Sequence, residues 1–343
     1  MTQRNRLLAL TAAALAVPAI LSGCAASSGS SGGDDKVSVV GFSVLKTANE
    51  PVISAFQKTD AGKDVSFTTS YGASGDQARA VIGGLHADEV HLSLEPDMSK
   101  LVESGDVSKD WNQNATDGIL TQSVVVFLVR KGNPLGIKGW DDLIKPGVKV
   151  ITPSPASSCS AKWNILAAWA HAADAPGGSD AKAKEFVTEL LHNTVAMPGS
   201  GSDALASFLA GNGDVLLAYE NDSIEAKAAG DDVDYIVPDD TLEIQNPAAV
   251  TTDASPAAQD FLDFQHSLEG QTLYAEAGFR PVIDGVQTDV PGANDPSDPY
   301  PAVPHLYTID QDFGGWAEAD PKYFDEDNGI ITKIISSLDI GSS

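Results

Sequence analysis

Cysteine and basic residues are scarce in this chain of 343 residues. It has two cysteines, Cys24 and Cys159, and 21 lysines and arginines against 48 aspartates and glutamates, for a formal net charge of −27. So acidic a chain argues against binding to nucleic acid or to anionic lipid, because both carry negative charge. The six histidines show no metal-ligand spacing beyond the loose pair His86 and His91, so we expect no metal and no cofactor.

A membrane-spanning hydrophobic run is also lacking. The apolar run 7–20 is too short to span a bilayer; it follows Arg4 and Arg6 and is followed by Leu21-Ser22-Gly23-Cys24. This pattern predicts a secretory signal over residues 1–23. The Leu-Ser-Gly-Cys ending resembles a bacterial lipobox, in which Cys24 is lipidated and becomes the new N-terminus. The alternative is an ordinary signal with a chance cysteine.

Processing of this kind sets the state of the mature chain. Removing residues 1–23 takes away two arginines and no acidic residue, so the net charge would change from −27 to −29. With Cys24 lipidated, only Cys159 remains and no intramolecular disulfide is possible. The Ser- and Gly-rich segment 24–36 is expected to be a flexible tether. We therefore expect a lipoprotein on the outer face of the cell membrane, on the periplasmic or cell-wall side.

Strand-like and helix-like segments alternate along the rest of the chain, which predicts an α/β fold with mostly parallel sheets. Roughly 310 mature residues exceed the usual size of a single core, so two lobes are expected. Strands are expected at 37–42, 65–69, 90–94, 124–130, 149–152, 215–219, 235–237 and 248–251, and helices at 51–58, 77–85, 98–103, 160–173, 181–192, 204–210, 223–229, 256–267, 271–277 and 331–338. The Pro- and Asp-rich stretch 281–304 is expected to be irregular and to wrap a surface.

Three turns rich in serine and glycine each come before a helix-like segment: 71–76, 157–160 and 199–203. The first N–H groups of a helix are unpaired and its dipole is positive there, so such turns favour an anion. The acidic surface repels anions only at long range, because salt screens its field within about 8–10 Å. The three turns could therefore converge on one small, strongly hydrogen-bonding ligand.

Acidic residues stand beside two of these turns. Asp76 and Asp203 either stabilise the first helical turn from outside or place a carboxylate in the cleft, where it would accept a proton from hydrogen phosphate. The first turn also resembles the nucleophile elbow of a serine hydrolase that would use Ser74, but Asp76 stands where the final glycine belongs. No His/Asp partner set for Ser74 is recognisable.

Eight segments together resemble one family. They occur in that family's order between about residues 37 and 335, and they are 71–82, 125–134, 140–143, 146–153, 163–164, 213–221, 278–281 and 313–316. On these the chain resembles the solute-capturing component of bacterial sulfate/thiosulfate ABC transporters. Within them, Trp163 and Trp316 are interpreted as packing residues, and Arg280 as one half of a structural salt bridge.

The resemblance implies a type II periplasmic-binding-protein fold, with two α/β lobes, two hinge crossovers and the ligand in the cleft between the lobes. Lobe one would be 37–122 plus 246–343, and lobe two 123–245. The crossovers would be 123–129 and 247–251.

The resemblance also implies a set of ligand-binding residues. Ser74 matches a serine whose hydroxyl and backbone N–H contact sulfate, and Ser158 matches the serine of the second turn. Ser200 matches a small residue that donates through its backbone, and Tyr219 occupies the position of a ligand-donating tryptophan. Ser43 lies in the first-strand loop that contributes another backbone donor.

The chain departs from this family at several of these positions. The usual glycine pair after the second-turn serine is replaced by Cys159 and Ser160, whose β-carbons could crowd the oxyanion. Ser160 could add a hydroxyl donor, whereas Cys159 is a weak donor at best. The family's aspartate after the first strand is missing, because Val44 follows Ser43.

The function implied is capture of sulfate or thiosulfate and its delivery to the permease subunits of an ABC transporter, by a monomer that performs no covalent chemistry. Sulfate carries no proton near neutral pH, so its binding groups should all donate hydrogen bonds. The alternatives are a receptor for another tetrahedral oxyanion such as phosphate or molybdate, a secreted serine hydrolase, and a scaffold with a degraded pocket.

Overall fold

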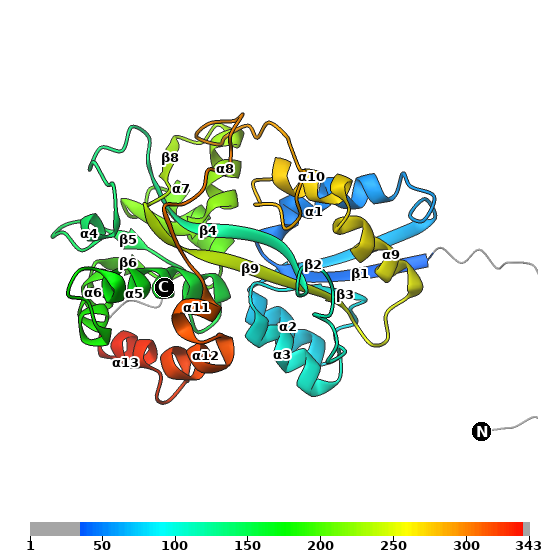
Figure 1. Cartoon of the computed structure of the whole chain (residues 1–343), viewed down its shortest axis with the longest axis horizontal. Coiled ribbons are helices and arrows are strands. Elements are labelled where there is room, and N and C mark those ends of the chain that lie inside the picture. The colour runs from blue at the N-terminus through cyan, green and yellow to red at the C-terminus, as the bar shows by residue number, and fades with distance from the viewer. Residues whose placement is uncertain (1–34, 339–343) are drawn as a thin grey trace, which may run out of the picture. The chain divides into compact units, whose positions relative to one another are not determined.

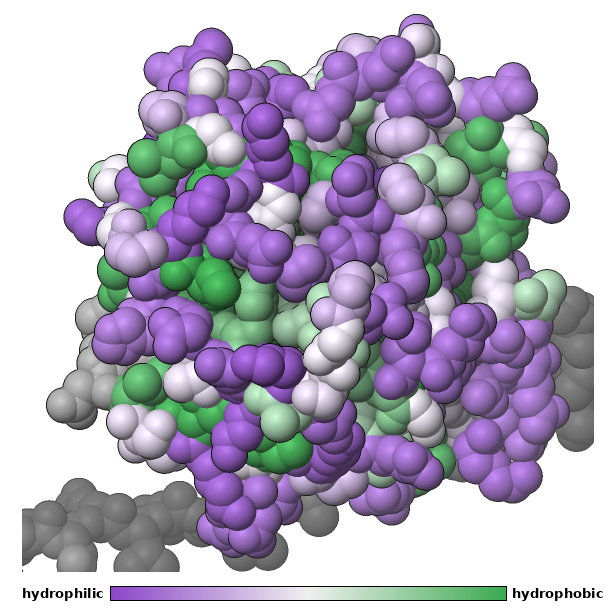
Figure 2. Space-filling model, turned by 60° about the vertical axis from the view of Figure 1, so that its left-hand side comes forward, coloured by the Kyte–Doolittle hydropathy of each residue, from purple (hydrophilic) through white to green (hydrophobic). Residues whose placement is uncertain are grey.

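The computed structural model describes residues 35–338. The predicted signal, Cys24 and all but the end of the predicted tether lie outside these residues. Within them, no helix has the length and apolar character that a membrane span requires. Figure 2 shows a face covered mostly by hydrophilic residues, with the hydrophobic ones in small separate patches, as the acidic composition leads us to expect.

Helices and strands alternate over most of the described chain (Figure 1). The strands are β1 Asp35–Phe42, β2 Val65–Gly72, β3 Glu89–His91, β4 Ile119–Arg130, β5 Val150–Ile151, β6 Thr194–Ala196, β7 Val215–Tyr219, β8 Val233–Ile236, β9 Asp240–Val250 and β10 His305–Tyr307. The helices are α1 Leu45–Phe56, α2 Ser74–Ile82, α3 Glu95–Ser104, α4 Trp140–Leu143, α5 Cys159–Asp174, α6 Asp180–His192, α7 Gly201–Leu209, α8 Glu220–Ala229, α9 Pro256–Gln265, α10 Leu268–Glu276, α11 Ile309–Phe313, α12 Trp316–Phe324 and α13 Ile330–Ser337.

Two long antiparallel strands, β4 and β9, join the two halves of the sheet. The strand order is β2-β1-β3-β9-β4-β7-β5-β6, with β10 beside β9 and β8 beside β4. The β1–β2, β1–β3, β5–β6, β5–β7 and β9–β10 pairs are parallel. Residues 119–124 of β4 pair with 243–247 of β9, and the next residues of β4 pair with β7 and β8 (Figure 1). The fold is the predicted mixed α/β fold with two lobes.

The burial of β4 explains why this strand can pair with strands in both halves of the sheet. Residues 124–129 are all apolar and at most 1% exposed, as in a strand covered on both faces. The first part of β9, by contrast, alternates polar and apolar residues. The predicted return strand therefore began too late: β9 starts at Asp240, and 243–247 is the part that pairs with β4.

Every predicted helix and strand overlaps an observed one, and 281–304 is irregular as predicted. Five short elements were not predicted: α4, α11, α12, β6 and β10. Helices α11 to α13 extend over α5 and α6, where Trp316 packs edge-to-face on Trp163 with ring centroids 4.8 Å apart. The side chain of Lys162 on α5 pairs with Asp320 on α12 at 2.5 Å. The packing role predicted for both tryptophans is confirmed.

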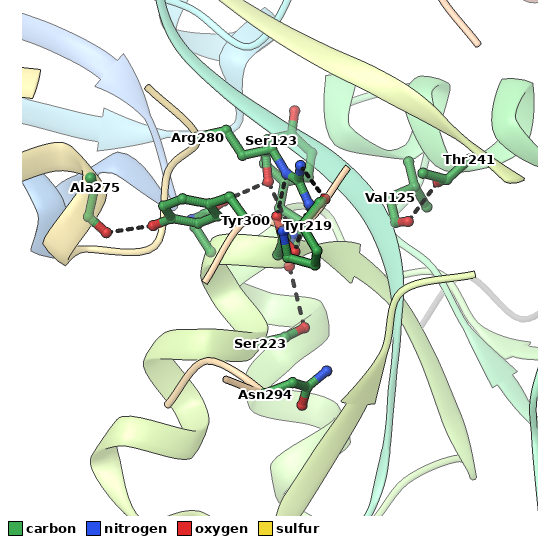
Figure 3. Close-up of polar contacts among 12 residues, drawn as sticks. Ser123, Val125, Tyr219, Ser223, Thr241, Ala275, Arg280, Asn294 and Tyr300 are labelled. Carbon is green, nitrogen blue, oxygen red and sulfur yellow. Dashed lines mark hydrogen bonds and ion pairs between the residues drawn. The ribbon is translucent and has the colours of Figure 1, made fainter. Parts of the chain in front are cut away.

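A third connection between the halves is held by a buried ion pair. The guanidinium of Arg280 donates to both carboxylate oxygens of Glu220, at 2.6 and 3.1 Å, and the Glu220 side chain is fully buried. The backbone N–H of Arg280 also donates to the carbonyl of Gln122 on β4. Figure 3 shows Arg280 beside this strand and the hydroxyl of Tyr300 directed at the carbonyl of Ala275. The salt bridge predicted for Arg280 is confirmed.

Replacing Arg280 by alanine should destabilise the fold by about 3–5 kcal/mol, because the Glu220 carboxylate would remain buried without its partner. The double variant R280A/E220Q should recover part of this loss, since no buried charge is left. Urea unfolding monitored by circular dichroism measures both. As a control, Lys131→Ala removes the exposed pair with Asp232 and should change little. Equal effects of Arg280→Ala and Lys131→Ala would contradict the interpretation.

Candidate functional site

The three serine- and glycine-rich turns meet at one cavity of about 420 Å³. Its walls come from the loop between β1 and α1, the loop between β2 and α2, the turn before α5 and the turn before α7. The lining residues are Ser43, Lys46, Tyr71, Gly72, Ala73, Asp76, Ser157, Gly199, Ser200, Ser202 and Asp203. The predicted convergence is therefore what the structure shows.

Helix N-termini provide the polar character of this cavity. Ala73, Ser158 and Ser200 are the N-cap residues of α2, α5 and α7, and Ser158 and Ser200 have extended backbones. The N–H groups of the first turn of each helix have no partner inside the helix. Because two of these caps line the cavity and the third directly follows the lining residue Ser157, the site suits an anion.

The two sides of the site are in contact. A β-carbon added to Gly75 on α2 would lie 3.6 Å from the carbonyl oxygen of Ser157, and one on Gly201 would lie 3.3 Å from the Cγ1 of Val44. Gly75 and Val44 come before β4 in the chain, whereas Ser157 and Gly201 lie between β4 and β9. The loops of the two halves of the sheet therefore close upon each other at the cavity.

Of the predicted site residues, Ser43 and Ser200 line the cavity itself. The hydroxyl of Ser200 accepts a hydrogen bond from the N–H of Asp203 and donates to the Asp203 carboxylate at 2.7 Å. This hydroxyl is thus occupied in capping α7, which leaves the backbone as the donor that Ser200 can offer.

The predicted hydroxyl donor Ser74 is buried and directed to a residue that sequence reasoning missed. Its Oγ donates to the carboxylate of Asp97 at 2.9 Å and accepts from the N–H of Ser93 at 3.0 Å. Its backbone N–H is in the first turn of α2. Ser74 therefore offers the site a backbone donor while its hydroxyl is held by Asp97. No motif marks Asp97, because the bond joins residues 23 positions apart.

Tyr219 ends β7 and is buried, with its hydroxyl 2.7 Å from the Oγ of Ser93. The carbonyl of Ser93 in turn accepts from the indole of Trp163 and the amide of Asn246. Burial raises the pKa of Tyr219 well above its ordinary value, so the hydroxyl keeps its proton and can donate. Ser93, which was not predicted, thus connects Ser74 and Tyr219.

Ser158, Cys159 and Ser160 begin α5 close to the same point. The hydroxyls of Ser158 and Ser160 are 2.7 Å apart, and the thiol of Cys159 donates to the Asp97 carboxylate at 2.7 Å. The thiol thus points toward α3, because Asp97 lies in the first turn of that helix, which begins at Glu95. Burial, and then the neighbouring carboxylate of Asp97, raise the pKa of Cys159 well above its ordinary value.

Asp76 and Asp203 both line the cavity and are exposed. Asp76 pairs with Arg79 one turn further along α2, and Asp203 is held by Ser200. Lys46 is the one basic residue among those that line this cavity in the described part of the chain. The sequence analysis offered two alternatives for these aspartates, a place in the first turn of a helix or a place in the cleft. Both descriptions apply, since each aspartate stands in the first turn of a helix and also lines the cavity.

Cys159 should react slowly with a thiol reagent in the native protein, because the thiol is buried, protonated and bonded to Asp97. Cys159 is the one cysteine in a chain without residues 1–24. With an aromatic disulfide as the reagent, the absorbance of the aromatic thiol that is released therefore measures the reaction of Cys159 directly. Full reaction is expected in denaturant. A matched variant, S202C on a Cys159→Ser background, places a thiol on the exposed rim and should react rapidly. Equal native rates would contradict the observed burial.

Comparisons with known proteins identify the family of this chain. Residues 37–280 match the family model described as bacterial extracellular solute-binding protein. The chain is 37% identical over 319 residues to a sulfate-binding protein of Synechococcus elongatus, covering 90% of this chain and 89% of that protein. It is 30% identical to a thiosulfate-binding protein of Pseudomonas aeruginosa, covering 83% of this chain and 87% of the relative.

Among solved structures, the chain is similar to the sulfate-binding protein SubI from Mycobacterium tuberculosis H37Rv. The two share 44% identity and a TM-score of 0.79, over 85% of this chain and all of that one. The chain therefore belongs to the bacterial extracellular solute-binding proteins.

Proposed function

We propose that this chain captures sulfate, or the related thiosulfate, outside the cytoplasm and delivers it to the permease subunits of an ABC transporter, without covalent chemistry. The observation that carries the proposal is the meeting of three helix-preceding turns at one cavity. Relatives named sulfate-binding and thiosulfate-binding proteins, similar over most of their length, support this choice of anion.

The range of binding free energy that neutral donors can supply includes micromolar affinity. Seven hydrogen bonds to a charged group, at about 1.5–3 kcal/mol each, give about 10–21 kcal/mol. Association and ordering cost about 4–15 kcal/mol, and micromolar binding needs about 8 kcal/mol. The donors in this proposal are the backbone N–H groups at Ser43, Ser74 and Ser200, those that begin α5 at Cys159 and Ser160, and the hydroxyls of Ser158 and Tyr219.

Closure of the lobes completes this site. We assign 37–122 plus 246–280 to lobe one and 123–245 to lobe two, with the hinge where β4 pairs with β9. Helices α11 to α13, which the sequence analysis placed in lobe one, pack on α5 and α6, and we group them with lobe two. The close approach of Val44 and of Ser157 to the positions that a β-carbon on Gly201 and on Gly75 would take then belongs to the closed state. In our proposal the protein is a monomer held on the membrane by lipidated Cys24, and its closed form is what the permease recognises.

Calorimetric titration with sulfate, thiosulfate, phosphate and molybdate tests the choice of ligand. We expect sulfate to bind with micromolar or better affinity. Phosphate should bind more weakly, because most of the proposed groups can only donate hydrogen bonds and a protonated oxyanion needs an acceptor. Tighter binding of phosphate than of sulfate would overturn the assignment, and turnover of aryl esters that Ser74→Ala abolishes would favour the hydrolase instead.

A methyl group at Gly201 should weaken sulfate binding about tenfold. Its carbon would lie 3.2 Å from the Oγ of Ser160 and 3.3 Å from Val44, so that closure would overpack by about 1–3 kcal/mol. Gly199→Ala is the matched control, because there the nearest atom would be 3.9 Å away. Calorimetry with sulfate compares the two variants. Equal affinities would show that the close approach of Val44 to Gly201 is not part of the liganded state.

A further inference from the structure

Asp222 is a buried carboxyl group that the site described so far does not use. It is the third residue of α8, directly after Tyr219, Glu220 and Asn221, and it is only 6% exposed. Among the described residues, no group holds its carboxyl by a hydrogen bond. A carboxylate buried without donors is costly, so this position is stable in the protonated form or with a ligand that supplies a partner.

The carboxyl group lies close to the point where the turns meet, just behind the residues that line the cavity. A β-carbon added to Gly201 would lie 3.9 Å from the Oδ2 of Asp222, and the same position is 3.2 Å from the hydroxyl of Ser160 and 3.3 Å from Val44. Asp222 therefore lies beside the N-terminal turn of α7 and the first turn of α5. Figure 3 shows Tyr219 and Ser223, between which Asp222 lies in the chain, at the end of β7 and the start of α8.

We propose that Asp222 is a specificity-determining residue of the oxyanion site and that sulfate binds while Asp222 carries its proton. This inference rests on the proposed function. Sulfate only accepts hydrogen bonds, so a neutral carboxyl group donates to it, whereas an ionised one repels it. At a pH where Asp222 is ionised in the ligand-free protein, sulfate binding is then coupled to the uptake of a proton by Asp222.

The charges around Asp222 fix the sign of this coupling. Burial raises the pKa of Asp222 well above its ordinary value, and the carboxylate of Glu225 on the same helix raises it further. On the same stretch of chain stand Tyr219, whose pKa burial raises and the charge of Asp222 raises further, and Glu220, which is paired with Arg280. On the neighbouring turns stand Asp203 of α7, the thiol of Cys159 of α5 and Lys46 of α1. Bound sulfate adds negative charge and stabilises the protonated form. The affinity for sulfate therefore falls as the pH rises through the pKa of the unliganded protein.

Calorimetric titration with sodium sulfate between pH 5 and pH 9 tests this. We expect the affinity to fall toward high pH, by up to tenfold per pH unit, and the apparent enthalpy to differ between two buffers of unlike ionisation enthalpy because a proton is taken up. Asp222→Asn should abolish both effects. Glu225→Gln is the matched control, because it removes the neighbouring acid of the same helix and leaves Asp222 in place. Both effects should persist, with the fall in affinity moved to lower pH because Glu225 no longer raises the pKa of Asp222.

The outcomes distinguish failure of the role of Asp222 from failure of the proposed function. Sulfate binding with constant affinity and no proton uptake would overturn the role of Asp222 and leave the proposed function standing. Absence of sulfate binding at every pH would overturn the proposed function and this inference with it. If Asp222→Asn does not fold, loss of the proton uptake in Glu225→Gln would assign the proton to Glu225 and overturn the inference, and its persistence would support Asp222.

Discussion

An acidic protein can hold a small anion only if donors outweigh the repulsion close to the ligand. This requirement places backbone N–H groups, which cannot be titrated, at the centre of the site. Each of the three helices α2, α5 and α7 offers only a first turn of unpaired N–H groups. One turn is too little, so the binding strength depends on bringing turns from both halves of the sheet together. The fold achieves this with β4 and β9, which pair with each other and then enter opposite halves.

The buried hydroxyl groups have a structural task as well. Ser74, Ser93 and Tyr219 form a chain of hydrogen bonds that runs from α2 to the end of β7. Asp97 accepts from Ser74 and from Cys159, which belong to opposite sides of the cavity. These bonds fix the helix starts relative to each other, and such preorganisation lowers the ordering cost of binding. Side chains that sequence comparison marks as ligand donors thus also hold the backbone donors in place.

Most of the fold could be predicted from the sequence, since apolar periodicity and glycine or proline stops marked nearly all long elements. The elements that were missed lacked these signals. Helix α12 contains Pro321, which indicates a helix stop, and the first part of β9 alternates polar with apolar residues. The convergence of three turns was also predictable, because each carries a local serine and glycine pattern. Asp97 and Ser93 were not, because their role arises from contacts between residues far apart in the chain.

Two buried carboxyl groups near the cavity differ in a way that only the structure reveals. Asp97 receives hydrogen bonds from a serine hydroxyl, a thiol and the ammonium group of Lys100, so its charge is compensated. Asp222 receives no hydrogen bond from residues 35–338, although it is buried to a similar degree. A buried carboxylate with donors, such as Asp97, strengthens the contact between the two sides of the cavity. A buried carboxyl group without donors, such as Asp222, is stable when it is protonated or when a ligand supplies a partner. In our proposal the acidic composition coexists with an anion site because the acids nearest to it are either held by a hydrogen bond or ion pair or carry a proton when sulfate is bound.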